Sequence, residues 1–112
     1  MKLLVNEFEK TFENYPMSSQ NTSLNPLINM KLFIWEIILY IIEYDKENKN
    51  AYWFIKNVDD YELDYIHIPT IENCYAWVKI DLNFKPKDLL SLLTEKDKKK
   101  ATEILLNQEF RI

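Results

Sequence analysis

The chain has 112 residues and a formal net charge of −4, with 47% apolar and 29% charged residues. This size and composition fit a single folded domain spanning 1–112 and exclude a chain that is disordered throughout. The sequence contains no glycine, which excludes the glycine-rich loops that hold phosphate in P-loop and dinucleotide-binding proteins.

The reactive residue types are scarce. Cys74 is the only cysteine and His67 the only histidine, which excludes an intrachain disulfide, a cysteine zinc cluster and a two-histidine metal site. We find no catalytic or cofactor motif, so we expect a protein that is not an enzyme and holds no cofactor. The first residues lack the apolar stretch of about 7–15 residues found in secretory signals, so we expect a cytoplasmic location.

An amphipathic helix is predicted at 2–14, where apolar residues such as Leu4, Phe8 and Phe12 recur at helical spacing. A polar loop follows at 15–25.

A second helix is predicted at 26–44. Asn25 suits the N-cap and Pro26 the first helical position, which needs no N–H donor. Its centre is the apolar run "LFIWEIILYIIEY". Because Glu36 and Glu43 interrupt this run, a membrane span is not expected. We interpret it as the central core helix, with a partly exposed face for dimerisation or partner binding as the alternative.

Residues 51–84 favour three strands that form an antiparallel meander. The clearest signal is the alternation over 60–65 of Tyr61, Leu63 and Tyr65 with acidic residues, which is typical of a half-buried strand. A helix over 51–65 is the alternative, because some aromatic residues there also match helical spacing. Since glycine is absent, we expect Asn or Asp wherever the backbone needs a positive φ.

The C-terminal part predicts helix. Pro86 begins a helical turn, and Thr94 with Asp97 three residues later resembles a capping arrangement at the start of another helix. The fold class expected is therefore α+β. It comprises about two N-terminal helices, a three-stranded antiparallel meander at about 51–84, and one or more C-terminal helices packed on one face of the sheet.

The predicted interaction site is the acidic segment 59–65. Its candidate partner-binding residues are Asp59, Asp60, Tyr61, Glu62, Asp64 and Tyr65. An acidic surface with aromatic anchors favours a protein partner of opposite charge.

We therefore predict a small acidic protein-binding protein with a basic protein partner. The type expected is a stoichiometric inhibitor, such as a bacterial immunity protein, an antitoxin or a phage anti-defence protein, that neutralises a basic toxin or nuclease. The alternative is a non-catalytic structural or adaptor subunit, which in one version is a homodimer. Nucleic-acid binding through the lysines at 96–100 is a weaker alternative, because residues 1–70 carry six Lys and eleven Asp or Glu.

Overall fold

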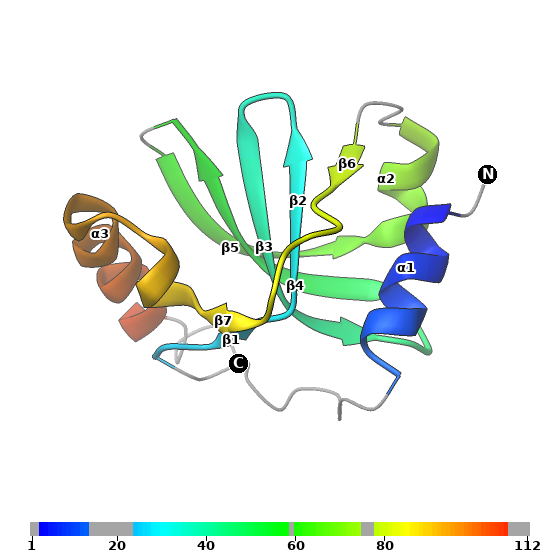
Figure 1. Cartoon of the computed structure of the whole chain (residues 1–112), viewed down its shortest axis with the longest axis horizontal. Helices are drawn as coiled ribbons and strands as arrows, with labels where there is room; N and C mark the ends of the chain where they lie inside the picture. Colours follow the sequence, from blue (N-terminus) through cyan, green and yellow to red (C-terminus); the bar gives the residue numbers. More distant parts are fainter. Residues whose placement is uncertain (1–2, 14–23, 59, 75–77, 108–112) are drawn as a thin grey trace.

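A computed structural model describes residues 3–13, 24–58, 60–74 and 78–107 (Figure 1). Its strands are β1 (Leu27–Ile28), β2 (Met30–Ile34), β3 (Ile37–Asp45), β4 (Asn50–Asn57), β5 (Asp60–His67), β6 (Val78–Ile80) and β7 (Lys87–Asp88). Its helices are α1 (Leu3–Thr11), α2 (Ile68–Cys74) and α3 (Glu95–Leu106), with a 3₁₀ turn η1 (Leu89–Leu92). Five strands form an antiparallel sheet in the order β5-β4-β3-β2-β6, and β1 pairs separately with β7.

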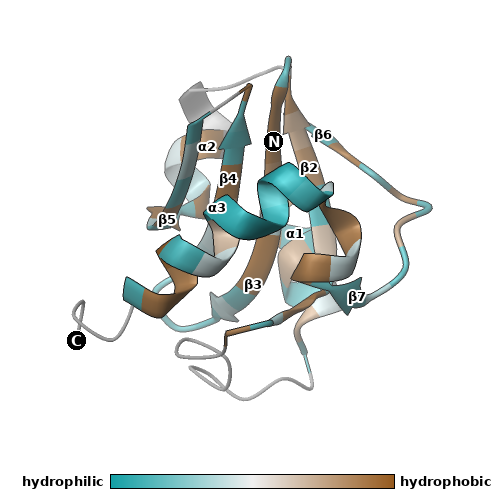
Figure 2. Cartoon of the chain, turned by 90° about the vertical axis from the view of Figure 1, so that its left-hand side faces the viewer, coloured by the Kyte–Doolittle hydropathy of each residue, from teal (hydrophilic) through white to brown (hydrophobic). Residues whose placement is uncertain are grey.

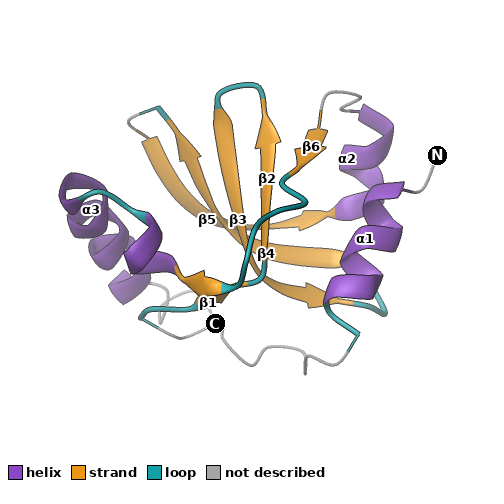
Figure 3. Ribbon diagram, viewed as in Figure 1, coloured by secondary structure: helices purple, strands orange, loops and turns teal. Residues whose placement is uncertain are grey.

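Helices lie against both faces of the sheet, so that the protein has three layers (Figures 1 and 3). On the first face, called the α1–α2 face, the apolar side of α1 and the start of α2 pack on β2, β3 and β4. The side chains that α1 and α2 bury there are Leu4, Val5, Phe8, Phe12, Ile68 and Ile71. On the second face, called the α3 face, η1 and α3 pack on β3, β4 and β5. The apolar side chains buried from that layer are Leu89, Leu93, Ala101 and Leu105.

The central strand β3 contributes side chains to both cores. Leu39 and Ile41 point to the α1–α2 face, while Tyr40 and Ile42 point to the α3 face. A bulge between Ile41 and Glu43 shifts the register, and Tyr44 thereby joins the α1–α2 face. There its ring lies 5.1 Å from that of Phe8. In Figure 2, β3 is accordingly hydrophobic along most of its length.

The helix predicted at 26–44 is wrong, because this segment forms β1, β2 and most of β3. The chain reverses at Trp35 and Glu36, and β2 then pairs with β3 from Met30↔Ile41 to Ile34↔Ile37. A strand covered on both faces has apolar side chains at nearly every position and loses its alternation. The apolar run is therefore a hairpin of two strands. The alternative prediction, a helix with a partly exposed face that binds a partner or a second copy, is wrong as well.

The α+β class is confirmed, and so is strand in place of helix at 51–65, where β4 and β5 form a hairpin. The meander, however, runs through β2, β3, β4 and β5 rather than over 51–84. The strand predicted as the third of the meander is the short β6, which pairs with β2 at the opposite edge of the sheet from β5. The chain reaches that edge because α2 replaces the turn expected after β5.

The helices predicted at the start of the chain and from Thr94 are confirmed. The helical turn predicted from Pro86 is shorter than expected, because Lys87–Asp88 form strand β7 and only Leu89–Leu92 form the 3₁₀ turn η1. The first helix is α1, and the last is α3, which packs on one face of the sheet. At the start of α3, the Thr94 Oγ1 accepts a hydrogen bond from the Asp97 backbone N–H at 3.2 Å, as the capping pattern predicts. Residues 15–23 of the predicted loop lie outside the described residues.

The expectation that Asn or Asp fills positions of positive φ is wrong for the described residues. Trp35, Lys49 and Val58 adopt φ values of 55°, 58° and 57°, one at each reversal between consecutive strands from β2 to β5. In this left-handed region the Cβ atom approaches the following carbonyl oxygen, at a cost of about 1–2 kcal/mol per residue. The β-branched Val58 fits this region worst.

We expect Val58→Asn to raise the free energy of unfolding by about 1 kcal/mol, because Asn tolerates the left-handed conformation. Urea unfolding followed by far-UV circular dichroism measures the difference. Lys46→Asn is the matched control, since Lys46 is an exposed turn residue without a positive φ. It should change stability by less than about 0.5 kcal/mol. An equal effect of both substitutions would contradict the assignment of backbone strain to Val58.

Candidate functional site

Three of the predicted site residues form one exposed line on the outermost strand β5. Asp60, Glu62 and Asp64 are all exposed, and we call them the acidic row. In the β4–β5 pairing, Glu62 lies opposite Ile55 and Asp64 opposite Trp53. Because opposite residues share a face and both partners belong to the core of the α1–α2 face, the acidic row lies on that face. Asp59 lies outside the described residues.

The two predicted tyrosines lie on the opposite face of β5. Tyr65 is 55% exposed, and its ring stacks on Tyr52 with centroids 4.6 Å apart. Tyr61 is half-buried, and its hydroxyl donates to Asp97 of α3. The structure therefore brings together the acids but separates them from the tyrosines, so that the six residues do not make one surface.

An apolar hollow lies next to the acidic row on the α1–α2 face. Its volume is about 180 Å³, and we call it the isoleucine groove. It is lined by Ile34, Ile37, Leu39, Trp53, Ile55, Ile66 and Ile71. Most of these isoleucines are only half-buried, because α1 and α2 cover the other part of this face. The acidic row therefore borders an apolar surface that is partly open to solvent.

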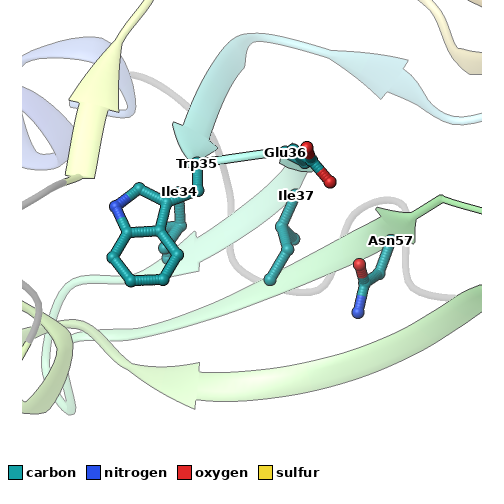
Figure 4. Close-up of a pocket in the computed structure, with 5 residues that line it drawn as sticks. All are labelled: Ile34, Trp35, Glu36, Ile37 and Asn57. Atoms are coloured by element: carbon teal, nitrogen blue, oxygen red, sulfur yellow. The ribbon is translucent and has the colours of Figure 1, made fainter.

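A second, wider hollow continues this surface to the tip of the β2–β3 hairpin. It has a volume of about 510 Å³ and is lined by Ile34, Trp35, Glu36, Ile37 and Asn57. Figure 4 shows Ile34, Ile37 and Asn57 pointing to one side of the sheet, with Trp35 and Glu36 at the turn. The Trp35 side chain is 78% exposed. Since the two hollows share Ile34 and Ile37, the apolar surface runs from the groove to this exposed tryptophan.

The residues that line the two hollows were not predicted as site residues from the sequence. The composition around Trp35 did contain a signal, because that run is rich in the strand formers Ile, Phe, Trp and Tyr rather than in Ala or Met. That composition favours two strands with a reversal between them.

A buried carboxylate fixes α3 to the sheet. Asp97 is 4% exposed and accepts hydrogen bonds from Lys56 Nζ at 2.5 Å and from the Tyr61 hydroxyl. Burial alone would raise the pKa of Asp97, but the hydrogen bonds from Lys56 and Tyr61 and the positive charge of Lys56 outweigh it and lower the pKa. Burial, together with the negative charge of Asp97, raises the pKa of Tyr40. This cluster joins α3 to β4 and β5, and the carboxylate at its centre is buried.

The remaining polar features are simple. The ring Nδ1 of His67 lies 3.0 Å from the hydroxyl of Thr70. Lys96, Lys99 and Lys100 are exposed on α3, on the opposite side of the sheet from the acidic row. Within the described ranges, no group of three His, Cys, Asp or Glu side chains is arranged to hold a metal ion. None of the helices in those ranges is long and apolar enough to cross a membrane.

Comparison of the chain with protein-family models, with curated proteins and with solved structures finds no match. The assignment of function therefore depends on the geometry of this surface.

The Asp97 cluster predicts the acid sensitivity of the fold. Because the pKa of Asp97 is lower in the folded protein than in the unfolded chain, its contribution to stability is present above the unfolded value of about 4. That contribution is lost as the pH falls through the lower folded value. We expect Asp97→Asn to cost about 1–3 kcal/mol at pH 7, with a smaller penalty at pH 3, measured by urea unfolding.

The control is Glu95→Gln, which removes an exposed carboxylate from the same helix and should change stability by less than about 0.5 kcal/mol. Hydrogen bonds from Asn48 and Asn25 lower the pKa values of Asp45 and Asp88, so Asp97→Asn should retain a residual acid sensitivity, whereas Glu95→Gln should keep that of the unchanged protein. An equal penalty for Asp97→Asn at pH 3 and pH 7 would contradict this account.

Proposed function

We propose that the protein is a small acidic protein-binding protein that acts as a stoichiometric inhibitor of a basic toxin or nuclease. The kinds of inhibitor that we propose are an immunity protein, an antitoxin or a phage anti-defence protein, acting in the cytoplasm. The observation that carries the proposal is the exposed row of Asp60, Glu62 and Asp64 beside the isoleucine groove.

The two parts of this surface suit the two demands of such binding. Proteins that act on nucleic acid are basic because they neutralise phosphate groups, and an acidic surface accelerates their encounter with an inhibitor. The apolar groove adds the desolvated centre on which the affinity of compact interfaces depends. Inhibition by occlusion needs no catalytic group in the inhibitor.

The alternative is a structural or adaptor subunit that pairs with a second copy of itself. The exposed Trp35 and the half-buried isoleucines favour it, because large apolar patches often mark interfaces. Charge opposes it, since a two-fold dimer through this face would bring two acidic rows into one interface. The oligomeric state therefore separates the two proposals.

We expect the purified protein to be a monomer at pH 7 and low salt, because the acidic rows repel one another. Size-exclusion chromatography with light scattering measures the mass, which should correspond to one chain of 13.6 kDa. A dimer at micromolar concentration that survives low salt would favour the structural subunit.

The inhibitor proposal is tested with the protein encoded beside the gene, since toxins and their inhibitors are produced together. We expect a basic neighbour that is toxic alone and harmless when coexpressed with this chain. Replacing Asp60, Glu62 and Asp64 by Ala should slow association at least about tenfold at low salt and flatten its dependence on salt. Association rates with the partner immobilised on a sensor surface, measured at two ionic strengths, give both effects.

The matched control replaces Glu47, Glu95 and Glu103 by Ala. These residues are exposed but lie on α3 or in the β3–β4 turn, and the control variant has the same net charge as the first. It should leave the association rate within about threefold, since only distant charges change. Equal rates for the two variants, or a neighbour that is neither bound nor neutralised, would contradict the proposal.

A further inference from the structure

We propose that the isoleucine groove receives one large apolar side chain from a basic amphipathic helix of the partner. The acidic row then contacts Lys or Arg residues along the flank of that helix. This inference rests on the proposed function for the basic character of the partner, and it goes further by naming the element that binds.

The groove has the size and chemistry for one apolar side chain. All seven of its lining residues are apolar or aromatic, and its volume is about 180 Å³. A protein cavity of about 150 Å³ with a similar lining accepts a benzene molecule. A leucine or phenylalanine side chain therefore fits, whereas a charged group there would lose its hydration without gaining a partner.

The position of the groove favours a helix over an added strand. Ile37 and Leu39 of β3 and Ile55 of β4 line it, so it lies over the interior of the sheet. A strand added beside β5 would lie about 5 Å beyond the sheet edge and could not cover β3. A helix lying on the face could, and it would continue the layer that α1 and α2 form over the rest of this face (Figure 1).

The border of the groove selects the charge of that helix. Glu62 lies directly across from Ile55, and Asp64 directly across from Trp53, so the carboxylates follow one side of the groove. Acids two positions apart on a strand are about 7 Å apart. Helix residues four positions apart rise by about 6 Å. Lys or Arg at every fourth position of a helix therefore matches the acidic row.

The hairpin tip supplies an anchor at one end of the groove. Trp35 is 78% exposed and has a φ of 55°. The backbone conformation is costly for a tryptophan, and the exposed ring has no role in either core cluster. Exposed tryptophans beside apolar hollows are frequent hot spots of interfaces. We assign Trp35 to contact with the apolar side of the bound helix.

The experiment uses three fluorescently labelled synthetic peptides of 18 residues, made of Leu and Lys or of Leu and Glu. The first places Leu at helical spacing and Lys on the flanks. The second has the same composition in an order without an apolar face, and the third replaces each Lys by Glu. Fluorescence anisotropy should give at least about tenfold tighter binding for the first peptide, because only it presents both an apolar face and positive charge.

Two variants locate the binding site. Glu62→Lys and Trp35→Ala should each weaken binding of the first peptide about fivefold or more. Glu103→Lys makes the same charge change as Glu62→Lys, but on the exposed side of α3, and should change the affinity less than twofold. Circular dichroism verifies that all three variants are folded, and each exchanged residue is exposed.

Equal binding of the first and second peptides, or equal effects of Glu62→Lys and Glu103→Lys, would overturn the inference and leave only general charge attraction. The peptide assay uses this chain alone, so its failure does not depend on the neutralisation assay. Neutralisation without peptide binding would retain the inhibitor and remove the groove. Peptide binding without neutralisation would retain the groove as a helix-binding site and contradict the role as an inhibitor.

Discussion

The fold depends on the burial of β3 on both of its faces. Its side chains alternate between two cores, with Leu39 and Ile41 in one and Tyr40 and Ile42 in the other. Each large apolar side chain that is removed from water contributes about 1.5–3 kcal/mol, and a sheet with only one covered face would leave half of this contribution unused. Helical layers are therefore required on both sides: α1 from the N-terminal part of the chain and α2, which follows β5, cover one face, and η1 and α3 from the C-terminal part cover the other.

The two layers are attached differently, and this difference creates the candidate site. On the α3 face, Asp97 joins the helix to β4 through Lys56 and to β5 through Tyr61, which fixes α3 over the sheet. On the other face, α1 and the short α2 pack mainly through apolar contacts, with one half-exposed ion pair at 3.7 Å between Glu9 of α1 and Lys49, and they cover only part of the surface. The half-buried isoleucines lie in the remaining part. The site is thus the portion of an apolar face that the chain's own helices do not reach.

Among the strands of the fold and of the candidate site, those covered on only one face could be predicted best from the sequence. The alternation in β5 is visible because that strand has one apolar and one acidic side, so both its type and its exposed acids were predicted. In β3 both sides are apolar, and the pattern could not distinguish a strand from a buried helix. The reversal at Trp35 carries none of the usual turn residues. The groove depends on the pairing of β2 with β3 and on the limited reach of α2, which no local pattern encodes.

The sign of the charge on β5 distinguishes recognition from protection. An outermost strand beside an exposed apolar surface invites association with other chains, and charged side chains of either sign prevent it. Lysine is the residue most often used for this purpose, and β6 at the other edge of the sheet carries the exposed Lys79. On β5, by contrast, the exposed charged side chains on the face of the groove, among the residues that the structure describes, are all acidic. Protection alone does not require one sign, whereas attraction of a basic partner does. The uniform sign of the acidic row is therefore the feature that best supports a role in binding.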